Sequence, residues 1–233
     1  MPAKKIKRLS AREGYDLWSE TYDSTPNPVV AMDSRHTIEL LSAKEGELIL
    51  DAGCGTGRHL KHLILAGTIP IGIDFSYGML NAARRNCPDV PLALADLEHP
   101  LPFQPSSFDA VLCSLIGEHL SELPALSREF HRVLKPGGRL VFSVYHPEMA
   151  AAGIEANFEK EGVEYRLGAV HYTVHRHLNV FQDARFVDVA TREFTGDEEL
   201  ARSVPSAAKY IGFPLLLVLT ARKAQLMSQS TQD

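Results

Sequence analysis

The chain has 233 residues, of which 45% are hydrophobic and 23% are charged, and its formal net charge is −5. This length and apolar fraction suffice for one buried core, so we expect a single domain over residues 1–233. A pI near 6.1 excludes a general basic field for a nucleic-acid backbone. We interpret the basic run Lys4, Lys5, Lys7 and Arg8 as a solvated terminal tail.

The cysteines and the apolar runs bound the cellular context. Cys54, Cys87 and Cys113 have no paired spacing, so they predict neither a disulfide framework nor a zinc site. The longest apolar run, Phe213–Leu219, is too short to cross a bilayer, and the N-terminus has no apolar signal segment. These features predict a cytoplasmic protein.

Apolar runs bounded by turn residues alternate with helical patterns through most of the chain. The runs predict strands at Leu48–Leu50, Ile69–Ile73, Pro91–Ala95, Phe108–Cys113 and Arg139–Tyr145. Helices are predicted to begin near Thr56 and near Ser76 and to cover Leu120–Leu134, where the turn at 135–138 stops the last one. This alternation is typical of a parallel sheet covered by helices on both faces.

The pattern loosens beyond Tyr145. Residues 146–168 are polar and interrupted by glycine, and only 186–189 and 215–219 again have the composition of strands. We expect these two strands to form an antiparallel end of the sheet. Gln225–Asp233 is predicted to be a disordered tail.

A glycine-rich turn joins the first of these strands to its helix at Asp51-Ala-Gly-Cys-Gly-Thr-Gly57. Such a turn brings a ligand against bare backbone at a helix N-terminus. Dinucleotide enzymes use G-x-G-x-x-G, but here Arg58 occupies the position of the third glycine. Asp51 would repel a pyrophosphate and attract the ammonium and sulfonium charges of S-adenosylmethionine (SAM). The turn therefore favours SAM over a dinucleotide.

Three carboxylates follow successive predicted strands. Asp51, Asp74 and Asp96 each stand at a strand C-terminus, which is the edge where open α/β sheets bind ligands. We expect Asp74 to bind ribose hydroxyls and Asp96 to lie within reach of an adenine amino group. Each residue alone has an equally good interpretation as a helix cap or a solvated loop residue. It is their recurrence that predicts a binding site.

With these motifs in place, the sequence resembles the class I SAM-dependent methyltransferases. The resemblance is specifically to the methyltransferase type 11 group, which includes ubiquinone and menaquinone biosynthesis enzymes, and it covers roughly residues 12–145. The matching motifs lie at 50–57, 72–76, 101–103 with 108–109, and 134–140. The resemblance implies a Rossmann-like α/β fold with a mostly parallel seven-stranded sheet of order 3-2-1-4-5-7-6.

The resemblance also implies which residues contact SAM or its product S-adenosylhomocysteine (SAH). Residues 15–23 resemble a helix, here about 10–24, that closes over the cofactor with Tyr22 facing it; aromatic packing is the alternative. The expected cofactor contacts are Tyr22, Asp51, Gly53, Cys54, Gly55, Thr56, Gly57, Asp74, Phe75, Ser76, Met79, Ala95, Asp96, Leu97, Ser114 and Leu115.

The catalytic groups are less determined than the cofactor contacts. The family often has Asn or Asp after its fourth strand, whereas this chain continues from Ser114 through Gly117 to His119. Methyl transfer is an in-line displacement that depends on alignment, and a base is required only where the acceptor must lose a proton. His146 is the first candidate for that base and His119 the second, with a structural role as the alternative for each.

Residues 146–178 are predicted to form a substrate lid that is mobile without ligand. Its apolar and aromatic residues, Met149, Ile154, Phe158, Tyr165 and Tyr172, would then line an acceptor pocket. We expect His171, His175 and His177 to share one face of a strand, but no cysteine completes a zinc signature, and we predict no metal.

The sequence therefore predicts a SAM-dependent methyltransferase acting on a small-molecule acceptor. The alternatives are a SAM-binding regulatory module without catalysis and a nicotinamide-dependent oxidoreductase. The expected partner is the small-molecule acceptor, with no nucleic acid and no membrane span, and a homodimer is left open. Neither the acceptor nor its methylated atom follows from the sequence.

Overall fold

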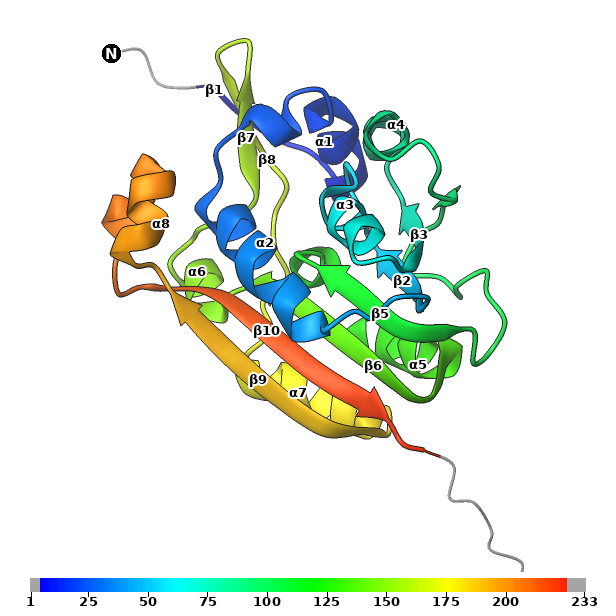
Figure 1. The fold of residues 1–233 in the computed structure, drawn as a ribbon. Coiled ribbons are helices and arrows are strands. Elements are labelled where there is room, and N and C mark those ends of the chain that lie inside the picture. Colours follow the sequence, from blue (N-terminus) through cyan, green and yellow to red (C-terminus); the bar gives the residue numbers. More distant parts are fainter. Residues whose placement is uncertain (1–4, 226–233) are drawn as a thin grey trace, which may run out of the picture.

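The computed structural model describes residues 5–225, and within them one large sheet carries the core (Figure 1). The sheet has seven strands in the order β4-β3-β2-β5-β6-β10-β9. Their bounds are β2 Leu48–Ala52, β3 Ile69–Asp74, β4 Leu92–Leu94, β5 Phe108–Ser114, β6 Leu134–Tyr145, β9 Phe186–Thr195 and β10 Pro214–Lys223. Numbered along the chain, this is the predicted order 3-2-1-4-5-7-6, and the predicted fold is confirmed.

The last two strands reverse direction. Strands β2 to β6 pair in parallel, whereas β10 is antiparallel both to β6 and to β9. Residues 215–219 of β10 are all buried, because this strand lies inside the sheet with a neighbour on each side. The predicted antiparallel end is confirmed, although both strands are longer than the apolar runs that indicated them.

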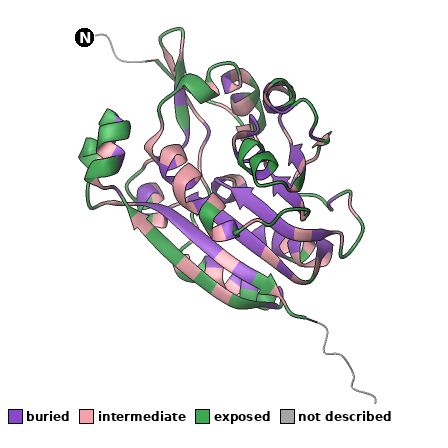
Figure 2. Ribbon diagram, viewed as in Figure 1, coloured by how far each residue is buried: buried purple, intermediate pink, exposed green. Residues whose placement is uncertain are grey.

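Helices cover both faces of this sheet, and Figure 2 shows that the buried residues concentrate on the central strands between them. Helices α2, α3 and α4 contribute to the core on one face, and α5 and α7 contribute to the core on the other. Their bounds are α2 Pro28–Leu41, α3 Arg58–Leu65, α4 Tyr77–Asn86, α5 Leu123–Val133 and α7 Val174–Asp183. Helix α2 was not predicted, although Asn27 caps it and Pro28 occupies its first turn.

A second, smaller sheet stands beside the N-terminal helix α1 (Ala11–Trp18). It has the order β1-β8-β7, formed by β1 (Lys5–Arg8), β8 (Val163–Arg166) and β7 (Asn157–Lys160). The basic run was expected to be a frayed tail, but its residues 5–8 pair in parallel with 163–166. That expectation is wrong for these residues because the 157–166 hairpin offers them an edge, while Lys4 lies outside the described residues.

The remaining elements correct several expectations about the lid. The predicted helix over residues 10–24 ends at Trp18 and is followed by the short η1. His175 and His177 lie in helix α7, which Thr173 caps, so their predicted strand is wrong. The short elements are η1 Tyr22–Ser24, η2 Gly117–His119, α6 Pro147–Ala151, α8 Glu198–Ser203 and η3 Pro205–Tyr210.

Two further sequence expectations concern the ends and the membrane. Of the predicted tail, residues 226–233 lie outside the described part of the chain. None of the helices within residues 5–225 is long and apolar enough to cross a membrane.

Candidate functional site

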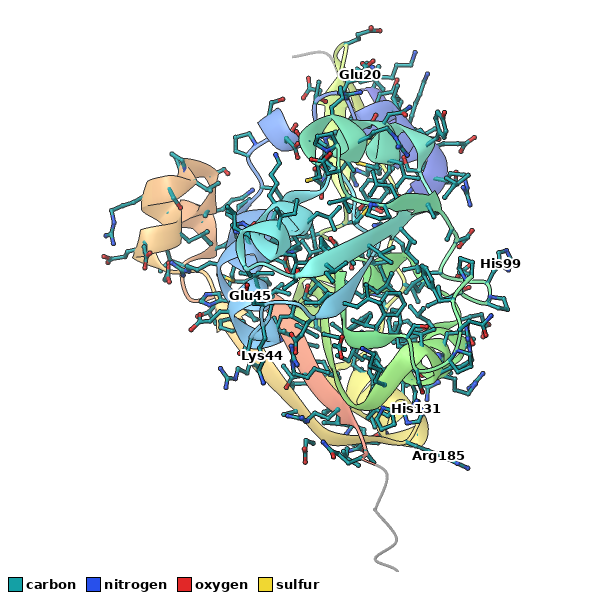
Figure 3. The ribbon with its side chains drawn as sticks, turned by 45° about the vertical axis from the view of Figure 1, so that its right-hand side comes forward. Glu20, Lys44, Glu45, His99, His131 and Arg185 are labelled. Atoms are coloured by element: carbon teal, nitrogen blue, oxygen red, sulfur yellow. The ribbon has the colours of Figure 1, made fainter. Side chains whose placement is uncertain are left out.

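A cavity of about 380 Å³ opens at the C-terminal ends of β2, β3 and β5, beneath helix α1. The exposed polar side chains labelled in Figure 3, such as Glu20, His99 and Arg185, lie at the periphery of the molecule. The residues that line the cavity are Ser10, Ala11, Arg12, Tyr15, Tyr22, Gly53, Cys54, Gly55, Thr56, Arg58, His59, Asp74, Phe75, Met79, Asp96, Leu97, Glu98, Ser114, Leu115, Ile116, His119 and Leu120.

Most of the predicted cofactor residues line this cavity. They are Tyr22, Gly53, Cys54, Gly55, Thr56, Asp74, Phe75, Met79, Asp96, Leu97, Ser114 and Leu115. Four predicted residues do not line it: Asp51, Gly57, Ser76 and Ala95. A side chain at Gly57 would meet Ala83 and Cys87, and the Ser76 hydroxyl caps α4, so both act in the support of the site.

The glycine turn leaves open space at Gly55. This residue has φ +54°, and a Cβ added to it would meet nothing within 4 Å. Its N–H donates to Oδ2 of Asp74 at 2.9 Å, which fixes the turn against the end of β3. The backbone therefore stands bare at the cavity, as the turn motif predicted.

Asp74 connects the glycine turn to helix α4. Its Oδ1 accepts from the Ser76 N–H at 2.8 Å, while its Oδ2 accepts from Gly55. Burial raises the pKa of Asp74 to about 6, although the N–H groups of Ser76 and Gly55 oppose the shift. The carboxylate thus borders the cavity from a fixed position.

Asp51 is buried beneath the turn with no partner. It is 1% exposed, and neither carboxylate oxygen has a hydrogen-bond partner within residues 5–225. Burial raises the pKa of Asp51 to about 7; the Arg58 charge opposes this shift and Asp74 adds to it. An unpaired buried carboxylate is costly, so this position is suited to a cation or to hydrogen-bond donors from a ligand.

Asp33 of α2 organises a buried polar network that sequence reasoning missed. Its Oδ2 accepts from Arg58 at 2.8 Å and from Ser114 at 2.6 Å, and it lies 2.9 Å from His59 Nε2. Burial alone would raise the pKa of Asp33, but Arg58 and the hydrogen bonds from His59 and Ser114 hold it well below the usual range. Arg58 is therefore a fixed cation on the cavity wall.

Helix α1 forms the roof of the cavity. Arg12 donates to the Phe75 carbonyl, pairs with Asp96 Oδ2 at 2.8 Å and lies over the Phe75 ring, 5.0 Å from its centroid. Asp16 accepts from the Ser76 hydroxyl at 2.6 Å, which ties α1 to the start of α4. Ser10 and Glu13 form a capping box at the start of this helix.

Tyr22 follows α1 and lines the cavity. Burial raises the pKa of Tyr22 to about 12, so the phenol is neutral. Next to it, Asp23 accepts from the Thr56 hydroxyl at 2.7 Å and so binds this segment to the glycine turn.

Only one of the two predicted catalytic histidines reaches the cavity. His119 lines it, with Nε2 2.8 Å from the Tyr15 hydroxyl, and burial lowers the pKa of His119 to about 4. His146 is 3% exposed and is not in the lining. Its Nδ1 accepts from the Glu148 N–H, and its Nε2 lies 3.0 Å from Glu193. Both of its nitrogens are thus used in capping α6 and contacting β9.

The predicted lid residues separate into different environments. Met149 is buried in the core beside β10, while Phe158 and Tyr165 stack on each other beside α1, and none of these lines the large cavity. Ile154 and Tyr172 border a second, smaller cavity. Within the described range no group of three or more His, Cys, Asp or Glu could hold a metal ion, and the three cysteines are buried and free.

Comparisons with known proteins find relatives among the methyltransferases. Residues 50–142 match a family model described as a methyltransferase domain. A malonyl-[acyl-carrier protein] O-methyltransferase of Yersinia pestis is 34% identical over 61% of this chain and 53% of its own length. A demethylmenaquinone methyltransferase of Renibacterium salmoninarum is also 34% identical, over 57% of this chain and 58% of its own.

A solved structure extends the likeness beyond the motifs. The S-adenosylmethionine-dependent methyltransferase of Mesorhizobium loti has a TM-score of 0.67 and 26% identity, over 80% of this chain and 95% of its own. This chain spans just over half the length of the two curated relatives. The resemblance drawn from the sequence and the predicted fold are confirmed.

Proposed function

We propose that this chain, whose residues 50–142 match the methyltransferase domain model, transfers a methyl group from SAM to a small-molecule acceptor. One observation supports the proposal above the others. The unpartnered Asp51 carboxylate lies next to a glycine turn whose Gly55 faces an open cavity of about 380 Å³. This combination suits a cationic ligand that approaches bare backbone.

The residues around the cavity fit the parts of SAM in turn. Asp74 would accept hydrogen bonds from the ribose hydroxyls, and Asp96 with the Phe75 ring would receive the adenine. The negative charge of Asp51 would favour the ammonium and sulfonium groups. Arg58, held by Asp33, would pair with the carboxylate of the methionine part. When bound, SAM supplies an electrophilic methyl group at its sulfonium.

The chain's own contribution to catalysis is alignment. A neutral Tyr22 and a neutral His119 lie on the side of the cavity towards α1, where they can orient an acceptor and exclude water. Since burial lowers the pKa of His119 to about 4, its imidazole is a weak base at neutral pH. His146, whose ring nitrogens are both engaged, has no place in this arrangement.

The names of the relatives support transfer and not mere binding. One acts on malonyl-[acyl-carrier protein] and others on demethylmenaquinone, and these names give no support to an inactive module. For this chain we propose a small-molecule acceptor, no nucleic-acid partner and a location in the cytoplasm. We further propose that α1 and residues 146–178 together form a lid over the acceptor.

Calorimetric titration with SAM, SAH and NADH tests the proposal. SAM and SAH should bind and NADH should not; tight binding of NADH without SAM would overturn it. Gly55→Val should abolish binding, because its side chain would fill the cavity. Gly46→Val is the matched control, since Gly46 has φ +78° and also has nothing within 4 Å, but lies outside the cavity lining. Mass spectrometry of a metabolite extract incubated with methyl-labelled SAM then identifies the acceptor.

A further inference from the structure

A second cavity, of about 20 Å³, lies on the other side of the short helix η2. Of the four consecutive residues 117–120, two line each cavity. His119 and Leu120 line the large cavity, whereas Gly117 and Glu118 line the small one. The small cavity is therefore next to the acceptor side of the proposed methyl-transfer site.

Glu118 carries a buried carboxylate without a well-formed hydrogen bond in the described residues. The residue is 7% exposed, and neither side-chain oxygen has a hydrogen-bond partner within residues 5–225. Burial raises the pKa of Glu118 to about 7, although the nearby backbone N–H groups of Glu118 and Tyr145 oppose the shift. Burial is the main cause of the raised pKa of Tyr22, which lines the large cavity, and of Tyr145, which lines the small one. The negative charge of Glu118 contributes to both shifts. The carboxylate thus lies between the two cavities.

His177 offers a second acceptor to the same small cavity. Its Nδ1 lies 3.0 Å from the Thr173 carbonyl, which can only accept, so Nδ1 carries the proton. Burial lowers the pKa of His177, so the ring is neutral and Nε2 carries a lone pair. This Nε2 has no partner within the described residues, and the residue is 3% exposed.

The two groups require a ligand that donates hydrogen bonds. The other polar side chains on the cavity wall have partners of their own, since Tyr172 donates to the Ser121 carbonyl, the Tyr145 hydroxyl accepts from Asn27, and Glu155 pairs with Arg8. A carboxylate, a phosphate or a carbonyl oxygen has no proton to offer and would leave Glu118 and His177 unsatisfied. The volume admits a single group about the size of a water molecule.

We propose that this small cavity is an acceptor subsite that binds a protonated amino group between Glu118 and His177. The inference rests on the proposed function, because it takes the large cavity as the cofactor site. An ammonium group has three hydrogen-bond donors and about the volume of one water molecule. Its positive charge would balance an ionised Glu118 carboxylate, which a neutral imidazole cannot do. The methyl acceptor is therefore an amine-bearing small molecule, anchored by its nitrogen.

Nitrogen NMR of the histidine side chains tests the subsite directly. The protein is labelled with ¹⁵N-histidine, saturated with SAH and titrated with methylammonium chloride, methanol or sodium formate at constant ionic strength. We expect methylammonium to shift the His177 Nε2 resonance saturably and formate to leave it unchanged. No shift with methylammonium, or an equal shift with formate or methanol, would overturn the proposal.

Two variants separate the subsite from general charge effects. Glu118→Gln should weaken methylammonium binding at least tenfold. Glu122→Gln removes the same charge from an exposed position four residues away, and it should leave binding unchanged. Equal weakening in both variants would count against the subsite. SAH affinity is measured on every variant, so a protein that binds SAH but not methylammonium refutes only this inference.

A search for the acceptor provides an independent test. A metabolite extract is separated by cation exchange, and each fraction is incubated with methyl-labelled SAM and the wild-type protein. The labelled product should arise from the retained, amine-containing fraction and should be at least tenfold lower with Glu118→Gln. Label found only among unretained neutral or anionic metabolites would show that the acceptor has no such amine.

Discussion

Two buried aspartates near Arg58 show opposite uses of the same side chain. Asp33, in α2, is 0% exposed and accepts hydrogen bonds from several neighbours, among them Arg58 and Ser114. Asp51, at the end of β2, is 1% exposed and has no partner in the described part of the chain. The pKa of Asp33 lies well below the usual range, whereas burial raises that of Asp51 to about 7.

Partners, and not burial, decide what a buried carboxylate does. A partnered carboxylate contributes to stability and fixes its cation in place. An unpartnered one destabilises the free protein and gains its partner when a ligand binds, which is the pattern of a binding site. Glu118 belongs with Asp51 in this respect, since its carboxylate is also unpaired.

The largest effect on stability is expected when the partnered carboxylate, Asp33, is removed. Asp33→Ala should lower the free energy of unfolding by about 3 kcal/mol, because it leaves Arg58 and the surrounding hydroxyls without their acceptor. Thermal unfolding measures this loss, and Asp183→Ala, at an exposed helix end, is the control. Because the folded pKa of Asp33 is lowered, its contribution is present above about pH 4 and declines below it. Equal melting temperatures for the two variants would contradict the structural role.

Asp51→Asn should move stability and binding in opposite directions. At pH 8 the variant removes an uncompensated buried charge, so its melting temperature should rise by roughly 2–4 °C for each 1 kcal/mol gained. A raised folded pKa means that the wild type loses stability as pH increases from about 4 to 7, so the gain should vanish near pH 4. SAM affinity should fall by about 1.5–3 kcal/mol. Asp183→Asn should change neither quantity, and a destabilised Asp51→Asn would refute the comparison.

Asp74 tests whether a carboxylate on the cavity wall combines both uses. Asp74→Ala should weaken SAM by about 1.5–3 kcal/mol in calorimetric titration, the usual scale for hydrogen bonds to a charged group. Asp74→Asn retains one oxygen for the N–H of Gly55 or Ser76 and should lose less affinity. Unchanged SAM affinity in the alanine variant would refute the assignment to the ribose.

The sequence predicted a role for Asp51 and not for Asp33, and the reason is physical. The strand-end carboxylates stand at the ends of short apolar runs, directly before turns, so local patterns place Asp51 and Asp74 at one edge of the sheet. Asp33 meets Ser114 and Ser143 across 81 and 110 residues of chain. Only the packing of α2 on the sheet brings these groups together, and no local periodicity encodes it.

The prediction for β1 was wrong for the same reason. Its residues 5–8 pair with 163–166, and their composition alone indicates a solvated terminus. His146 has the right residue type at the right strand end, but its use as a cap for α6 depends on the conformation of the following turn. The cofactor side of the site was thus predictable from local motifs, whereas the acceptor side required the tertiary structure.

The titration of Asp51 and Asp74 should make cofactor binding depend on pH. The pKa values of about 7 for Asp51 and about 6 for Asp74 mean that both are partly protonated below neutral pH. If the ionised forms bind SAM, affinity should rise with pH between about 5 and 8 and then level off, by at most tenfold per titrating group and pH unit. Calorimetry in buffers of different ionisation enthalpy should detect proton release near pH 6.5. In Asp51→Asn the upper part of the rise should be absent.

The smallest expected effect concerns the motion of the lid. Trp18 of α1 stacks on Phe158 with ring centroids 4.9 Å apart, and β1 pairs with β8, so α1 and the hairpin should move as one unit. In hydrogen exchange, both should exchange faster than β5 in the free protein, and SAH with acceptor should slow them together by a few fold. Trp18→Ala should uncouple the two responses, whereas Trp18→Phe keeps a ring at this contact and should preserve the coupling. Slow exchange across residues 146–178 without response to ligand would show that this segment is a fixed wall, and acceptor entry would then depend on α1 alone.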